Sequence, residues 1–163
     1  DLKGFSDTYY QELTEGTLVP VLETLQRLKK WGIHTEIVNL VVPSKNDDSG
    51  QVAAMCRWIK NELGPNVPLH FSRFYPLYKL KSLPPTPVTT LEEARNAALK
   101  EGLNFVYIGN VPGHPGQHTD CPRCRTRLIE RTGYMVQVVH LKEGSCGKCG
   151  LPIPGVWSLP QRS

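Results

Sequence analysis

The sequence lacks several features that would point to a function at once. Its 163 residues contain no apolar run long enough to span a bilayer, and no signal peptide is visible at Asp1. A Gly-rich phosphate loop, a Ser–His–Asp arrangement and an HExxH motif are also absent. Aromatic residues make up 8% and the net charge is only +4, which gives little basis for a nucleic-acid-binding surface. The length suits one sizeable core, or a medium domain with a small appendage.

Cysteine is also scarce, but four of the five cysteines are regularly spaced. They form the pairs Cys121-Pro-Arg-Cys124 and Cys146-Gly-Lys-Cys149, with 21 residues between the pairs. This spacing predicts a tetrahedral thiolate site with structural zinc, or with iron in the same position. Two disulfides or a redox C-x2-C motif are the alternatives. Thiols with metal spacing favour a reducing environment, so we expect the protein to be cytoplasmic.

Several basic residues and histidines flank these pairs. We expect the basic side chains to neutralise a negatively charged metal site rather than to bind nucleic acid. Four thiolates already fill a tetrahedron, so the histidines are expected to lie outside the ligand set. The basic residues are Arg123, Arg125, Arg127 and Lys148, and the histidines are His114 and His118.

The first two thirds of the chain alternate between apolar strand patterns and helical patterns. Strands are expected over residues 1–5, 36–42, 67–75 and 105–108. Helices are expected over residues 17–31, from about 50 to 63, and from a capping box at Thr90 to Gly102. Helical connections between apolar strands predict a parallel α/β sheet. Cys56 lies on the buried stripe of the second helix and is interpreted as a core residue.

Composition changes near Gly113, after which Cys, Gly, Pro and Arg are frequent. Residues 134–139 form one strand of an expected hairpin in this part. We therefore predict two units, an α/β unit over residues 1–112 and a metal-binding ribbon with four cysteine ligands over residues 113–163. The chain begins at Asp1 in an apparent strand, so we expect the α/β unit to be part of something larger.

In parallel α/β folds, functional side chains lie at the carboxyl ends of the strands. The candidates are Asp1, Lys3, Asn39, His70 and Ser72. Alternation places Asp1 and Lys3 on one face, although they could equally be a structural ion pair. His70 lies on an apolar strand, where a histidine is more often a hydrogen-bonded core residue.

Arg73 and Tyr75 are further polar residues at the end of the same strand. They lie on the opposite face of that strand from His70 and Ser72, and the pattern does not say which face points inward.

Several motifs together resemble a known family. They are Asp1-Leu-Lys-Gly-Phe5, Asn39-Leu-Val-Val-Pro43 with Asn46-Asp47, His70-Phe-Ser-Arg-Phe-Tyr-Pro76, Tyr107-Ile-Gly-Asn-Val-Pro-Gly113, the two cysteine pairs, and Ile153-Pro-Gly-Val-Trp157. The first three resemble the radical SAM enzymes related to pyruvate formate-lyase activating enzyme. The combination with the tail resembles the radical SAM member of the AmmeMemoRadiSam system. The resemblance covers essentially the whole chain.

The resemblance implies the carboxyl-terminal half of a partial (β/α)6 radical SAM barrel of the TIM-barrel type, strands four to six, followed by a small zinc-ribbon-like or rubredoxin-like extension. Asp1 and Lys3 match the family's D-x-K pair at the S-adenosylmethionine site. The Lys3 ammonium would pair with the methionyl carboxylate and Asp1 would orient it. Asn39, His70 and Ser72 would line the same cavity. A protein substrate or partner of the same system is implied, without a membrane and without nucleic acid.

The sequence also departs from that family. The C-x3-C-x2-C loop that holds the [4Fe–4S] cluster and the Gly-Gly-Glu strand are absent, and Ser44 follows Pro43 where the family usually has Gly. The parent protein would therefore cleave S-adenosylmethionine reductively, whereas this chain alone is expected to be inactive. The alternative is a binding module, an α/β domain whose zinc ribbon contacts protein or nucleic acid.

Overall fold

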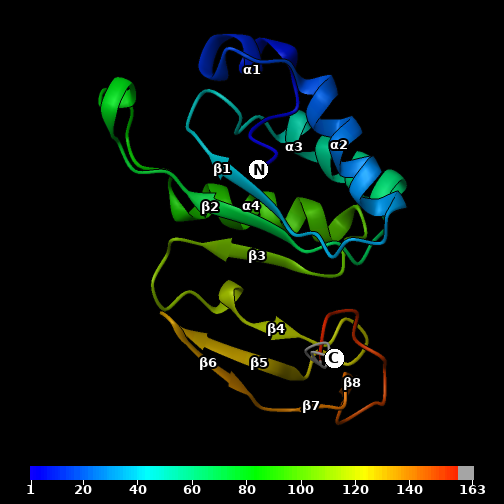
Figure 1. The fold of residues 1–163 in the computed structure, drawn as a ribbon. Coiled ribbons are helices and arrows are strands. Elements are labelled where there is room, and N and C mark those ends of the chain that lie inside the picture. The colour runs from blue at the N-terminus through cyan, green and yellow to red at the C-terminus, as the bar shows by residue number, and fades with distance from the viewer. Residues whose placement is uncertain (158–163) are drawn as a thin grey trace, which may run out of the picture.

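The protein's structure, a computed structural model, describes residues 1–157. Its mixed α/β architecture confirms that part of the prediction (Figure 1). Residues 158–163 of the predicted ribbon lie outside the described residues. In chain order the elements are α1 (Asp7–Thr14), α2 (Leu18–Lys30), β1 (Ile37–Val41), α3 (Ser49–Trp58), the π-helical segment η1 (Ile59–Leu63), β2 (Leu69–Arg73), the 3-10 turn η2 (Tyr78–Leu80), α4 (Val88–Lys100), β3 (Val106–Gly109), the 3-10 turn η3 (Pro115–Gln117), β4 (Thr119–Asp120), β5 (Arg127–Thr132), β6 (Met135–Val138), β7 (Leu141–Lys142) and β8 (Ser145–Cys146).

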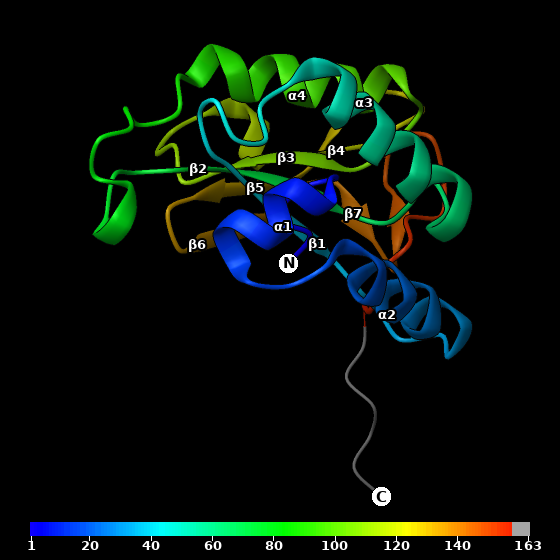
Figure 2. The same ribbon diagram turned by 90° about the horizontal axis from the view of Figure 1, so that it is seen from above.

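A three-stranded parallel sheet forms the centre of the first part of the chain. The strand order is β1-β2-β3, with Ile37 opposite Leu69 and Leu69 opposite Val106. Helices α3 and α4 cover one face of this sheet (Figure 2). Leu69 and Phe71 of β2 are fully buried in the same core as residues of α3 and α4, because alternate strand residues point to that face. The other face is not covered by these helices.

Residues 1–4 lie beside β1 but do not form the strand that the sequence predicted. The Leu2 N–H donates a hydrogen bond to the Val38 carbonyl at 3.0 Å, and Leu2 is fully buried in the main core. The chain then turns into α1, which the sequence analysis missed. The Ser6 hydroxyl caps α1 by accepting a hydrogen bond from the Tyr9 N–H.

The predicted capping box at Thr90 is also wrong. Helix α4 already begins at Val88, with Pro87 at the N-cap position, so Thr90 lies inside the first turn. The reason is the preceding residue, Thr86, which is fully buried and fixed. Its hydroxyl accepts a hydrogen bond from the Phe74 N–H at 2.9 Å and donates one to the Val41 carbonyl at 2.6 Å. This anchor ends the proline-rich loop and sets where α4 starts.

The second part of the chain forms small antiparallel sheets beyond β3 (Figure 1). One sheet has the order β4-β5-β6, and β7 pairs with β8. The core of this second part of the chain contains two of the four cysteines and one residue that directly precedes β3. The members are Phe105, Cys121, Leu128, Ile129, Cys146 and Ile153. The main core and this ribbon core therefore meet at β3, and the division between residues 112 and 113 stays a prediction. Within residues 1–157, none of the helices combines the length and apolar character that a bilayer crossing requires.

Candidate functional site

The two cysteine pairs lie in turns of the same local geometry. In the first turn the Arg125 N–H donates to the Cys121 carbonyl at 2.9 Å, and in the second the Gly150 N–H donates to the Cys146 carbonyl at 2.9 Å. Arg125 and Gly150 both have left-handed backbone, with φ of 60° and 70°. The N–H of each first cysteine is also fixed, at 2.8 Å to the Thr126 carbonyl and at 2.9 Å to the Leu151 carbonyl. These turns hold both sulfurs of a pair on one side of the backbone.

The four sulfurs converge on one point. Cys121 Sγ lies 3.6 Å from Cys149 Sγ, Cys124 Sγ lies 3.6 Å from Cys146 Sγ, and all four lie within 4.8 Å of one another. A tetrahedral ion with metal–sulfur bonds of about 2.3 Å separates its ligands by about 3.8 Å. A disulfide would need about 2.05 Å. The close approaches join one cysteine of each pair to one of the other pair, so the four residues form a single site that could hold a metal ion.

The polar surroundings of this site differ in part from the prediction. The Thr126 hydroxyl lies 3.3 Å from Cys124 Sγ, and Thr126 lowers the pKa of this thiol to about 6, which favours the thiolate. Arg127 does not neutralise the charge of the thiolates as predicted, because its Nε pairs with the Asp120 carboxylate at 2.6 Å. It also approaches Glu130 at 3.8 Å.

Neither histidine that flanks the first pair belongs to the ligand group. His114 Nε2 lies 3.2 Å from Glu92 Oε1, and His118 Nδ1 accepts a hydrogen bond from the Arg131 N–H at 3.0 Å. His114 therefore ties the loop after β3 to α4, and His118 ties the segment before β4 to β5.

The structure brings Asp1 and Lys3 together as an ion pair at 3.0 Å, with half of the Asp1 side chain and 36% of the Lys3 side chain exposed. Leu2 between them points into the core, so in this extended segment its two neighbours point toward the uncovered face of the sheet. The Lys3 backbone is fixed on both sides. Its N–H donates to the Tyr10 hydroxyl at 3.1 Å, and its carbonyl accepts from the Asn46 amide.

His70 and Ser72 lie on that uncovered face too, because they alternate with the buried Leu69 and Phe71. Asn39 does not. It is 2% exposed, pairs in register with Phe71, and its amide contacts the sulfur of Met55 in α3 at 3.7 Å. The structure therefore groups four of the five predicted residues on one face and places Asn39 on the other. Binding of S-adenosylmethionine by these residues stays a prediction.

Asn39 nevertheless connects to the predicted site through the backbone. Its side-chain N–H donates to the Leu2 carbonyl at 2.8 Å, which fixes the segment between Asp1 and Lys3. Within residues 1–157 its Oδ1 atom is buried and has no hydrogen-bond partner.

The sequence analysis missed a polar chain that links the parallel sheet to the ribbon. His70 Nε2 lies 2.8 Å from Glu36 Oε2, and its ring stacks on Tyr107 with centroids 4.9 Å apart. The Tyr107 hydroxyl lies 3.0 Å from Thr119 Oγ1, to which Arg131 Nη1 donates at 2.8 Å. Hydrogen bonding by His70 lowers the pKa of the Glu36 carboxyl below its ordinary 4.5. His70 and Tyr107 are register partners near the starts of β2 and β3, and Glu36 directly precedes β1. Polar residues near the starts of successive strands are the signal that could have found them.

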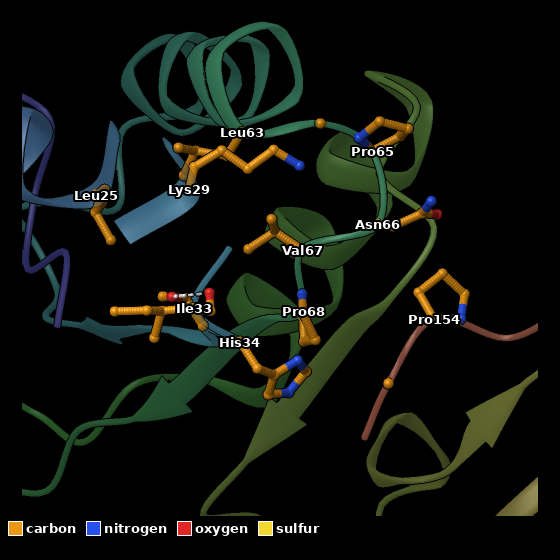
Figure 3. Close-up of a pocket in the computed structure, with 13 residues that line it drawn as sticks. Leu25, Lys29, Ile33, His34, Leu63, Pro65, Asn66, Val67, Pro68 and Pro154 are labelled. Atoms are coloured by element: carbon orange, nitrogen blue, oxygen red, sulfur yellow. Dashed lines mark hydrogen bonds between the residues drawn. The ribbon is translucent and has the colours of Figure 1, made fainter. Parts of the chain in front are cut away.

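A cavity of about 230 Å3 lies at the amino ends of β1 and β2, and His34 in its lining lies 3.5 Å from Glu36. It is lined by residues of α2, by the loops that precede β1 and β2, and by the tail (Figure 3). Lys29 and His34 are its charged or titratable groups, and most other lining residues are apolar, such as Val67, Pro68 and Pro154. This cavity lies at the amino ends of the strands, away from the carboxyl ends where Ser72 and Asn46 lie.

Comparisons with known proteins give a relative and a related fold. No protein-family model matches the sequence. The chain is 48% identical over 152 residues to the uncharacterized protein MJ0808 of Methanocaldococcus jannaschii, which covers 92% of this chain and 45% of that protein. The chain thus spans less than half the length of this curated relative.

The crystal structure of a domain of pyruvate-formate lyase-activating enzyme from Bacteroides vulgatus superimposes with a TM-score of 0.59. It is 13% identical in sequence, and the match covers 68% of this chain and 65% of that one. The chain therefore has a fold related to that of an activating-enzyme domain, joined to a four-cysteine cluster that could hold a metal ion.

Proposed function

We propose that this chain is the carboxyl-terminal portion of a radical SAM enzyme of the activating-enzyme type, specifically the member of the AmmeMemoRadiSam system. The observation that carries the activating-enzyme part of the proposal is the fold match to a domain of pyruvate-formate lyase-activating enzyme. The assignment to the AmmeMemoRadiSam system rests on the sequence resemblance of the tail motifs. The greater length of the relative MJ0808 agrees with a longer parent protein. In this proposal β1 to β3 belong to a partial (β/α)6 barrel, and their uncovered face is its interior.

The proposed half-site for S-adenosylmethionine is the uncovered face that carries Lys3, His70 and Ser72. The Lys3 ammonium is the one of these groups suited to a carboxylate, and Asp1 at 3.0 Å fixes its direction. Asn39 acts through the backbone, because its amide holds the Leu2 carbonyl. We therefore assign Asn39 a positioning role rather than contact with the cofactor.

The chemistry requires a second cofactor that this chain does not provide. A [4Fe–4S] cluster supplies the electron that cleaves S-adenosylmethionine and is held by cysteine thiolates. Four of the five cysteines form the ribbon site, and the fifth, Cys56, is fully buried with its pKa raised to about 12 by burial. The cluster therefore belongs to the parent protein, and the chain alone is inactive.

The four-cysteine site is proposed to hold zinc in a structural role. Four thiolates fill a tetrahedron and leave no open position for substrate, which is typical of structural zinc. Metal analysis of the purified chain checks this directly. One zinc per chain is expected, whereas one iron per chain would indicate a rubredoxin-like site. Absence of metal, with the four cysteines joined in two disulfides, would refute the assignment.

Binding of S-adenosylmethionine to the half-site is measured by amide chemical-shift titration of the purified chain. The largest shifts are expected at residues 1–4 and at His70 and Ser72, and Lys3→Ala should weaken binding at least about tenfold by removing the carboxylate partner. Lys30→Ala, an exposed lysine of α2, is the matched control and should bind like the wild type. Shifts elsewhere only, or equal binding by Lys3→Ala, would refute the half-site.

A protein is the proposed partner of the parent enzyme, and the cytoplasm its compartment. Part of the basic charge is already used within the chain, because Arg127 pairs with Asp120 and Arg131 donates to the Gln117 carbonyl and to Thr119. This argues against phosphate binding by the ribbon and favours the enzyme over the binding module that contacts nucleic acid.

A further inference from the structure

Strand β6 is unusual because no element among residues 1–157 covers it on either face. All four of its residues are exposed, and Tyr134 before it is exposed as well. Met135, Val136 and Val138 have exposed fractions of 78%, 62% and 58%. No charged residue occurs between Gly133 and Val139. Native proteins usually protect an edge strand with charge, proline or a covering element, so an uncharged apolar edge of this kind indicates an interface.

The outer edge of β6 also offers unused backbone groups. Figure 1 shows β6 as the outermost strand on its side, and within residues 1–157 only β5 pairs with it. The Val139 N–H donates to the Leu128 carbonyl at 2.9 Å, so Val139 points its backbone groups toward β5. Alternation along an antiparallel ladder then directs Gln137 and Met135 inward. The N–H and C=O groups of Val136 and Val138 therefore point away from β5.

We propose that β6 pairs with β6 of a second copy of this chain, antiparallel and about a two-fold axis at Gln137. In this register Val136 of one copy forms a hydrogen-bonded pair with Val138 of the other, and the reverse, because these residues carry the outward backbone groups. The two three-stranded sheets become one continuous six-stranded sheet.

The side chains of this strand complement themselves in that register. Val136 faces Val138 of the other copy, Met135 faces Val139, and the Gln137 amides face each other across the axis. Apolar cross-strand pairs stabilise a sheet and like charges directly opposite destabilise it. A neutral apolar strand places no like charges together, which favours a second copy as the occupant. This proposal is independent of the chemistry proposed above.

The interface is expected to be modest. Pairing of one short strand buries less than the roughly 800 Å2 per partner of a standard interface, so a reversible dimer is expected rather than an obligate one. Its readout is mass: sedimentation equilibrium should move from 18.3 kDa toward twice that value as the concentration rises from about 1 to about 500 μM.

A charge swap at Gln137 tests both the partner and the register. Gln137→Lys and Gln137→Glu each place like charges opposite each other at the axis, so each variant alone should stay monomeric. An equal mixture should recover a dimer that contains one chain of each kind, because the opposite charges then pair. Val19→Lys, at an exposed apolar position on α2, is the matched control and should dimerise like the wild type. Circular dichroism checks that every variant is folded.

Each remaining outcome overturns the proposal. A wild-type chain that stays at 18.3 kDa at every concentration would mean that β6 does not pair with a second copy and that another partner covers it. A dimer unaffected by either Gln137 variant would place the interface elsewhere. Monomeric single variants without recovery in the mixture would refute the axis at Gln137.

Discussion

Thr86 is predicted to be the residue on which the carboxyl ends of β1 and β2 most depend. Its hydroxyl sits between the two strands at the point where they separate, directly after the last register pair, Val41 and Arg73. There it bridges the Phe74 N–H and the Val41 carbonyl. Thr86, Val41 and Phe74 are 0%, 0% and 5% exposed, so water cannot replace the hydroxyl without rearrangement.

Thr86→Val tests this bridge because valine keeps the shape and removes the hydroxyl. Two buried backbone groups lose their partner, at about 1–3 kcal/mol each. The added methyl group offsets about 1 kcal/mol of this cost. We therefore expect the free energy of unfolding to fall by about 3 kcal/mol. Thr86→Ser keeps the hydroxyl and should lose only about 1 kcal/mol, since one buried methyl group is removed.

Urea denaturation followed by circular dichroism measures this difference, with the metal content matched between variants. The ordering of the variants is the decisive result. If Thr86→Val lost less than about 1 kcal/mol, or if Thr86→Ser lost as much as Thr86→Val, the hydroxyl would not carry the stabilisation that we assign to it.

Two further predictions concern the ribbon and the polar chain. Cys146→Ser should speed hydrogen exchange beyond Gly113 more than in the parallel sheet, because Cys146 belongs to the ribbon core; Cys56→Ser, in the main core, should do the reverse, and global loosening by Cys146→Ser would contradict the separate cores. The lowered pKa of Glu36 means that its ionised form stabilises the fold above pH 4.5, and that this contribution is lost as the pH falls through the folded pKa. Glu36→Gln should therefore lose less stability than the wild type between neutral pH and about pH 3 in urea titrations, and identical pH profiles would show that the pair with His70 contributes nothing measurable.

The parallel sheet and the four-cysteine cluster were predictable because their signals are local. Two residues between cysteines fix the geometry of a turn. The periodicity of α2 follows from the apolar side chains that pack half-buried against the main core, and that of β1 from alternate buried residues. The capping box failed for a non-local reason. Thr90 has the correct local pattern, but the contacts of Thr86 with two distant strands start α4 earlier.

The predicted cofactor residues show the same division. Ser72 lies near the carboxyl end of β2 as the sequence predicted, whereas His70 lies near the start of that strand and Asn39 in the middle of β1. The face on which each side chain lies depended on how the strands pack. Asn39 is polar and yet lies on the face that the helices cover. Its burial is tolerated because its side-chain N–H donates a hydrogen bond to the Leu2 carbonyl. His70 instead pairs with Glu36 and stacks on Tyr107, and these contacts join residues far apart in the chain.

The sequence by itself determined the alternation of strands and helices and the four-cysteine site, because periodicity and short spacings act within a few residues. Only the tertiary structure decided which face of β2 is covered, how Glu36, His70 and Tyr107 meet, and that β6 is exposed among the residues that the structure describes. Each of these depends on which segments become neighbours. A strand such as residues 134–139 has the same pattern whether it is buried or exposed, and only its neighbours decide between the two.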